Sequence, residues 1–346
     1  PYVSSELRGE LPRVKPDDPE LMAALASVAD SPGDEGRRRV LGDLLMERGD
    51  PRGEFLLLQF LIAENQASGP IRQRAEDLWR THKREWMAGV DKLLCEVKLD
   101  RGFPIEARLL EAVTPAMLTA ALGAPMLVTL RKLACAYQGS AIVEALASPR
   151  LRELREVVLA RRELFAAAAE RGVQGRLTGL SLGFELTKED CAVLLGSPVF
   201  SKVSRLCVRG SPVPEARSSR WARILAPAKL GMMAGHLERL VVHPSLKRVT
   251  LTGDAFGDHR RFAELVAVWP RLKLEQLTVP GSFELAREAE GTSLTLQNMT
   301  SQEMITVRPL VPAGTVKVLL MPKRDHDTSS REKLLKAYSG LGARTV

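Results

Sequence analysis

Aromatic residues are scarce in this chain of 346 residues, at 5% of the sequence, although hydrophobic residues reach 45%. The core must therefore be filled mainly by Leu, Val and Ala, which favours helical and repeat architectures over a sandwich rich in aromatic side chains. No run reaches the roughly 18 apolar residues that a membrane-spanning helix needs. The composition predicts a globular protein, which we expect to be soluble and cytoplasmic.

Cysteine and histidine are also few, and their spacing excludes the common sites that are built from them. The four cysteines lie far apart and form no Cys-x-x-Cys pair: Cys95, Cys135, Cys191 and Cys207. The five histidines include no His-x-x-x-His pair, and there is no Gly-x-Ser-x-Gly segment. We therefore predict reduced thiols, no metal, no cofactor and no catalytic residues.

Acidic residues do not balance the basic ones, since 42 Asp and Glu stand against 50 Lys and Arg, a net charge of +8. Such a charge favours acidic proteins or nucleic acid as partners where it is clustered. Residues 71–88 form one cluster, a predicted basic helix with Trp79 and Trp86 on its apolar stripe. The basic side chains there are either the solvated face of a core helix or a surface that binds nucleic acid.

The stretch "ERGDPRGEF", residues 47–55, packs five charges, two glycines and a proline between two apolar runs. Gly49 after a helix, Asp50 as an N-cap and Pro51 as a first helical residue predict a corner between two helices. A phosphate-binding loop is the alternative, but the Gly-Lys-Ser/Thr ending of such loops is absent. The two helices predicted before the corner turn apolar faces inward, with Met22 on the first and Val40 on the second.

Residues 37–62, a following Trp-containing helix and "RGFPIEARL" (101–109) resemble a bacterial repeat-companion domain. The matching positions run through the predicted corner: Arg39, Leu41, Asp43, Leu45, Glu47, Arg48, Gly49, Asp50, Pro51, Arg52, Gly53, Glu54, Phe55 and Gln59. Gly42 and Leu44 stand where the family usually has Ala and Trp. The resemblance covers roughly residues 18–110. It implies a helical domain beside leucine-rich or similar repeats, and no catalytic residues.

Repeats follow, because the pattern L-x-x-L-x-L or a close variant starts at residues 130, 154, 177, 203, 246 and 274. Most neighbouring copies lie 23 to 28 residues apart, which is typical of leucine-rich repeats with a short strand and a returning helix. The longer interval after 203 is either one repeat with an insertion or two repeats, the second strand being "LERLVV" at 237, although a helix is preferred there. "GTSLTL" at 291 is interpreted as a degraded copy.

The fold class predicted is α/β, with an N-terminal helical domain packed on an irregular leucine-rich-repeat-like solenoid of parallel short strands and outer helices. Irregularity is expected because the Asn that normally links neighbouring repeats is replaced in every copy, by Gln138, Arg162, Glu185, Ser211, Asp254 and Ser282. The predicted divisions are an irregular arm (1–16), the helical companion domain (17–112), the solenoid (113–306) and a strand–helix cap (307–346).

Function is expected on the concave side of the solenoid, where the third and fifth positions of each strand point. The predicted partner-binding residues are Lys132, Glu156, Arg205, Cys207, Arg209, Arg248 and Gln276. Arginines that can bind carboxylates in bidentate geometry predict a non-enzymatic scaffold that docks a protein with an acidic surface. The first alternative is nucleic-acid binding through helix 71–88 and the basic solenoid edge. The second is a hydrolase at the domain junction, to which no motif points.

Overall fold

The computed structural model describes residues 18–87, 90–110, 112–122, 127–135, 141–209, 231–240, 242–252, 259–280, 282–297, 299, 304–305, 307–321, 328–341 and 344–345. The protein is a mixed α/β protein whose strands pair mostly in parallel. It divides into two compact units, residues 1–155 and 156–346. The predicted arm, 1–16, lies outside the described residues, and the predicted domain boundaries stay predictions.

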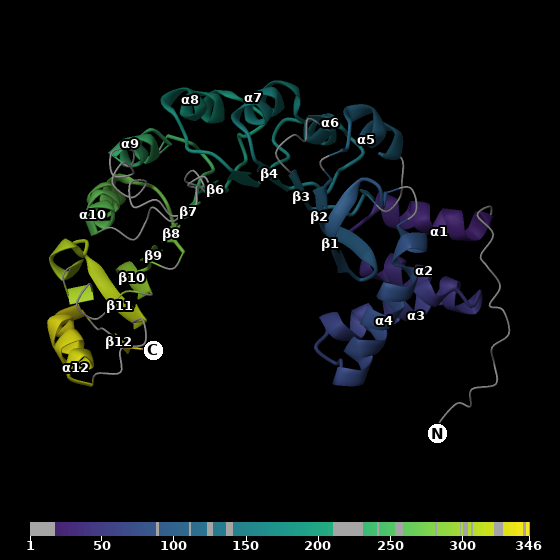
Figure 1. The fold of residues 1–346 in the computed structure, drawn as a ribbon, viewed down its shortest axis with the longest axis horizontal. Helices are drawn as coiled ribbons and strands as arrows, with labels where there is room; N and C mark the ends of the chain where they lie inside the picture. The colour runs from purple at the N-terminus through teal and green to yellow at the C-terminus, as the bar shows by residue number, and fades with distance from the viewer. Residues whose placement is uncertain are drawn as a thin grey trace, which may run out of the picture. The chain divides into compact units, whose positions relative to one another are not determined.

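The first unit begins with four helices, which are followed by an antiparallel hairpin and then by short helices and a strand. Its elements are α1 (Pro19–Asp30), α2 (Glu35–Glu47), α3 (Pro51–Ala63), α4 (Gly69–Trp86), β1 (Leu94–Asp100), β2 (Phe103–Leu109), α5 (Pro115–Ala121), β3 (Lys132–Cys135) and α6 (Ala141–Ala147). Figure 1 shows the four leading helices together, in purple and blue.

The stretch 47–55 is the corner between α2 and α3, as predicted. Gly49 has a φ of 67°, the left-handed conformation that glycine tolerates best. The Asp50 carboxylate caps α3 by accepting from the Arg52 amide at 2.8 Å. Gly53 lies where the two helices cross, because a Cβ there would meet the Met46 nitrogen at 2.5 Å. Gly49 therefore permits the backbone conformation of the corner, and Gly53 permits the close crossing of α2 and α3.

The neighbouring charges and the aromatic ring of this stretch tie the helices to one another. The Arg48 guanidinium binds the carboxylates of Asp18 and Glu20 on α1. Glu54 receives two 2.7 Å hydrogen bonds from Arg74 on α4. Phe55 packs against Trp79 and Trp86, with ring centroids 6.0 and 5.0 Å away. Both tryptophans therefore belong to the core, as one of the two sequence alternatives has it.

Two predictions for this region are wrong. Met22 and Val40 are exposed, since the buried stripes of their helices are formed by Leu21 and Val28 and by Leu41 and Leu45 instead.

The region is also not wholly helical, because β1 and β2 form a hairpin within residues 17–112. Arg101 and Gly102 both have positive φ, at 47° and 77°, as a two-residue type I′ turn requires. The hairpin closes the core, since Phe103 packs with the leucines of α1 and α2.

The second unit alternates strands and helices before it ends in a hairpin and a strand–helix pair. Its elements are β4 (Glu156–Leu159), α7 (Arg162–Arg171), β5 (Gly179–Leu182), α8 (Lys188–Gly196), β6 (Arg205–Arg209), α9 (Gly231–Leu240), β7 (Arg248–Thr252), α10 (His259–Val268), β8 (Gln276–Val279), β9 (Phe283–Glu288), β10 (Gly291–Gln297), β11 (Thr315–Met321), α12 (Thr328–Ala337) and β12 (Arg344–Thr345).

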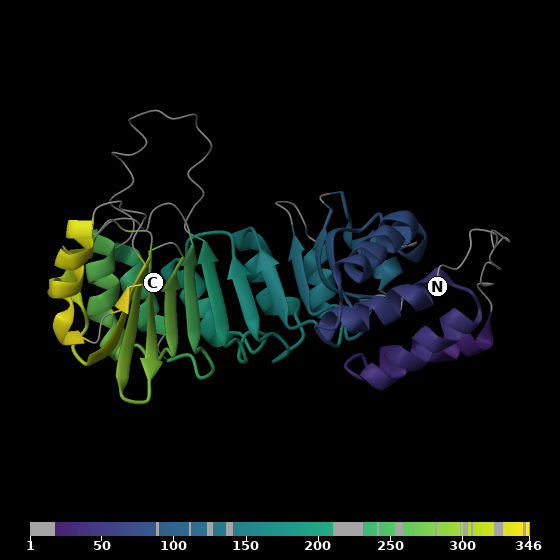
Figure 2. The same ribbon diagram turned by 90° about the horizontal axis from the view of Figure 1, so that it is seen from below.

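Strands β4 to β8 run in parallel in sequence order, and the helices between them lie on one side of the sheet (Figures 1 and 2). Alternate residues face the helices and form the core, as in the stacked leucine and valine row Val157, Leu180, Leu206, Val249 and Leu277. The intervening residues face the other side, here called the open face. All six strands predicted from the repeat pattern, β3 to β8, are present.

The long interval between two of these strands holds no further strand of the sheet, because β6 pairs directly with β7. "LERLVV" contributes to helix α9, as preferred from the sequence. The alternative of a second strand at 237 is therefore excluded, and residues 210–230 lie outside the described residues. The segment "GTSLTL" forms β10, which pairs antiparallel with β9 and in parallel with β11, and its interpretation as a degraded copy stays a prediction.

Candidate functional site

Two rows of side chains cross the open face of β4 to β8. Strand register places side by side the residues of the first row, Glu156, Gly179, Arg205, Arg248 and Gln276. The second row lies two residues further along each strand and contains Val158, Ser181, Cys207, Thr250 and Thr278. Small side chains in the second row leave room beside the long ones of the first.

These rows line a hollow of about 200 Å³ on the open face. Arginine, glutamate and glutamine lie on one side, and hydroxyl and thiol groups lie on the other. Five predicted partner-binding residues line it together: Glu156, Arg205, Cys207, Arg248 and Gln276. Thr278 donates from Oγ1 to the Glu284 carboxylate of β9 at 3.2 Å. The last hydroxyl group of the second row is therefore already bound to an acceptor.

Glu156 and Arg205 form an ion pair that passes over the strand between them. The strand between is β5, and the residue under the pair is Gly179. A Cβ on Gly179 would meet the Glu156 Cγ at 2.8 Å, so the glutamate side chain lies directly on the glycine. Gly179 is consequently buried although it lies on the open face.

Arg248 differs from Arg205 in forming no ion pair with a carboxylate of the described residues. Its side chain is exposed and makes no hydrogen bond or ion pair with any residue that the structure describes. Adjacent strands lie about 4.8 Å apart, so the guanidinium groups of Arg205 and Arg248 lie close together on the open face. The described lining of the hollow therefore carries two positive charges and one negative charge.

The remaining two predicted residues are not placed with these five. Lys132 lies on β3 of the first unit, with its Nζ 3.7 Å from a carboxylate oxygen of Glu106. Arg209 ends β6, and its side chain lies outside the described part. Cys207 is half-buried on the open face, and Cys135 is buried.

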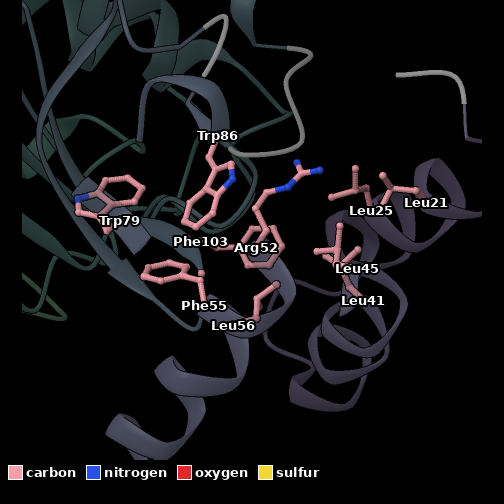
Figure 3. Close-up of a pocket in the computed structure, with 11 residues that line it drawn as sticks. Leu21, Leu25, Leu41, Leu45, Arg52, Phe55, Leu56, Trp79, Trp86 and Phe103 are labelled. Atoms are coloured by element: carbon pink, nitrogen blue, oxygen red, sulfur yellow. The ribbon is translucent and has the colours of Figure 1, made fainter. Parts of the chain in front are cut away.

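The first unit contains a second hollow, which the sequence did not indicate. Figure 3 shows it between the leucines of α1 and α2, Phe103 and the aromatic residues of α3 and α4. Its volume is about 40 Å³, less than a drug-sized ligand needs. The one charged group on its wall, Arg52, is already bound to the Asp50 carboxylate. The hollow is a narrow gap between two packed clusters of hydrophobic side chains in the core.

Two of the five Lys and Arg side chains of the basic helix α4 are paired with carboxylates. Arg74 binds Glu54 through two nitrogens, and Arg80 binds Glu76 and Asp77 at 3.2 Å each. Lys83 lies over the Trp79 ring, with its Nζ 5.8 Å from the centroid. Arg72, Lys83 and Arg84 form no ion pair with the residues that the structure describes, so three cations of α4 are available to phosphates, fewer than tight binding to a phosphate backbone uses.

Buried titratable groups lie on the helix side of the second unit, away from the hollow. Burial, with the nearby Asp190 charge, raises the pKa of the Cys191 thiol to about 11, so it stays protonated at neutral pH. Burial lowers the pKa of His243, whose Nε2 lies 3.2 Å from the Phe200 carbonyl oxygen. Neither group faces a partner-accessible surface.

Within the described ranges, no group of three or more His, Cys, Asp or Glu side chains could hold a metal ion. None of the helices in those ranges is long and apolar enough to cross a membrane.

Sequence reasoning found five of the eleven residues that line the hollow but missed how Glu156 and Gly179 relate. One signal was present, since "LTGLSL" is the only copy with glycine at the outward third position. Comparison of the chain with models of known protein families, with curated proteins and with solved structures finds no match. The resemblance to the repeat-companion domain therefore stays a prediction.

Proposed function

We propose that this chain is a non-enzymatic cytoplasmic scaffold that docks an acidic segment of another protein on the open face of strands β4 to β8. The repeats form an irregular leucine-rich-repeat-like solenoid, and the N-terminal region is its companion domain. The observation that carries the proposal is the 200 Å³ hollow, in which Arg248 is exposed and without a carboxylate among the described residues.

The solenoid is supported by the recurrence of one unit. Each of the strands β4 to β7 is followed by a helix on the same side, and each of β4 to β8 contributes leucine or valine to a continuous row. One such unit cannot bury its own apolar strip, whereas a stack of units can. An extended open face is the usual consequence, and extended faces suit protein docking better than small-molecule binding.

The chemistry of the hollow supports docking over catalysis. Its described lining includes no histidine, and its one carboxylate, Glu156, is bound to Arg205. A general base needs a free lone pair near the reacting proton, which a carboxylate held by a guanidinium does not offer readily. Guanidinium, amide and hydroxyl groups instead are donors, and donors bind a carboxylate.

Nucleic acid is the less supported partner. Binding to a phosphate backbone needs several unpaired cations in a row. On α4 the arginines Arg74 and Arg80 are paired with carboxylates of the same or the neighbouring helix.

The test is affinity capture from native cytosol, with Arg205→Glu/Arg248→Glu compared with wild type. Lys247→Glu/Arg271→Glu is the matched control, because it makes the same charge change in the same unit outside the hollow. We expect one protein, captured by wild type and the control, to be lost from the hollow variant. Equal capture by all three would place docking elsewhere. Capture that nuclease abolishes would favour nucleic acid.

A further inference from the structure

Glu156 is the one acidic side chain of the described lining, and it occupies an arginine of the site. It reaches that arginine from two strands away, because register pairs β4 with β5 and β5 with β6. Most cross-strand pairs join adjacent strands, where side chains lie opposite one another. The Glu156–Arg205 ion pair therefore requires that the residue between them on β5 has no side chain in its path.

Gly179 meets that requirement. Any Cβ there would lie 2.8 Å from the Glu156 Cγ, inside van der Waals contact. The equivalent residues on the flanking strands, Glu156 and Arg205, carry long side chains. Glycine at this position thus lets the carboxylate lie flat on the sheet, where a ligand of the hollow would otherwise lie.

The ion pair is exposed enough to be exchanged. The Arg205 side chain is 53% exposed and that of Glu156 is 33% exposed. Ion pairs at such surfaces contribute little stability, so a competing carboxylate can replace one member at small cost. The neighbouring Arg248 has no such internal carboxylate among the described residues and can capture the competitor first.

We infer that Glu156 is an internal stand-in for the partner's carboxylate, and that an acidic partner segment displaces it from Arg205. The inference rests on the proposed docking function and names the partner chemistry of that site. A first carboxylate of the segment binds Arg248 beside Gln276. A second, about 5 Å away as at positions i and i+4 of a helix, takes the place of Glu156. The internal pair therefore selects for segments with at least two neighbouring acidic side chains.

The charges of the hollow favour this occupant. Two arginines and one glutamate leave one net positive charge while Glu156 is in place, and two once it has left. The pair itself demonstrates that a carboxylate fits against Arg205 on this face. A segment with two carboxylates neutralises the charges of Arg205 and Arg248, and the displaced Glu156 side chain is then exposed to solvent.

The experiment measures binding of a fluorescein-labelled deca-glutamate peptide by anisotropy, with deca-glutamine as the neutral probe. Glu156→Gln should bind the acidic probe about twofold to fivefold more tightly than wild type, as expected when a weak competing pair is removed. Arg248→Gln should bind it about tenfold more weakly. The matched controls are Glu275→Gln and Lys247→Gln, from a surface pair with 2.7 Å between its charged atoms and outside the hollow. Neither control should change the affinity by more than twofold.

Gly179→Ala is the variant that changes no charge. Its methyl group should push Glu156 off Arg205 and tighten binding of the acidic probe, but add nothing when Glu156 is already Gln. Thermal unfolding curves of all variants establish that each is folded.

The outcomes separate the two proposals. If Arg248→Gln weakens binding and Glu156→Gln leaves it unchanged or weaker, the stand-in role is overturned and docking survives. If Glu275→Gln tightened binding of the acidic probe as much as Glu156→Gln does, net charge alone would explain the effect. The stand-in role would then be overturned as well. If neither wild type nor Glu156→Gln binds the acidic probe better than the neutral one, the acidic-partner function itself fails.

Discussion

His243 joins two successive turns of the second unit. Its Nε2 donates to the Phe200 carbonyl at 3.2 Å, and its Nδ1 accepts from the Ser245 amide at 3.3 Å. The bond from the Ser245 amide needs a neutral ring, since a protonated imidazole has no acceptor nitrogen. Burial lowers the pKa of His243, although the bond to Phe200 opposes this.

A pH dependence follows from this residue. Because the pKa of His243 is lower in the folded than in the unfolded chain, the unfolded chain binds the proton more readily below about pH 6.5. The free energy of unfolding should therefore fall as the pH drops from 7 toward 5, and His243→Gln should flatten that fall. Urea unfolding at several pH values measures it. His82→Gln, on the surface of α4, is the control; a slope equal to that of wild type in His243→Gln would contradict the assignment.

Helices α2 and α3 approach one another closely at Gly53, which lies against the backbone of α2. A Cβ on Gly53 would meet the Gly42 carbonyl oxygen at 2.7 Å as well as the Met46 nitrogen. Backbone atoms cannot move aside as a flexible side chain can. The crossing therefore requires glycine at residue 53.

The Gly53→Ala variant should force α2 and α3 apart and lower the free energy of unfolding by about 1–3 kcal/mol, as overpacking generally does. Gly69→Ala is the control, because a Cβ on this first residue of α4 has no neighbour within 4 Å. It should change stability by less than about 0.5 kcal/mol. Chemical denaturation followed by circular dichroism compares the two, and equal effects would refute the role of the crossing.

Elements were predictable from sequence to different degrees. The strands β3 to β8 followed from a pattern that places leucine or valine at every second position, and a short strand buried on one face requires that alternation. The same pattern did not predict that β10 pairs antiparallel with β9 and in parallel with β11, because the pattern does not encode the partner strand or its direction. Met22 and Val40 were misassigned because a helix has room for more apolar residues than its buried stripe.

At the scale of the whole molecule, the count of 50 Lys and Arg overstates the cations available for binding. Many arginines are held by carboxylates, as Arg48 is by Asp18 and Arg205 is by Glu156. A partner that uses only Arg205 and Arg248 would release few counterions.

Salt dependence should therefore be shallow. Between about 50 and 200 mM salt, we expect the affinity for the acidic probe to fall about tenfold or less, since two contacts give a small slope. Six or more phosphate contacts would instead lower the affinity by about a thousandfold or more over this range. Titrations at four salt concentrations, with single-stranded DNA as the second probe, decide between these. A steep slope with the DNA bound more tightly would contradict protein docking.

Local features of the protein were determined by sequence alone: the helix corner at residues 47–55, the repeated strands and the outward positions where Arg205 and Arg248 lie. Such features depend on residues close in the chain, through caps, glycine conformations and the alternation of a strand. Tertiary structure decided which outward residues meet. Glu156 lies 49 positions before Arg205, and only the pairing of three strands brings its carboxylate over Gly179. Contacts of that kind depend on register between distant segments, which no local pattern records.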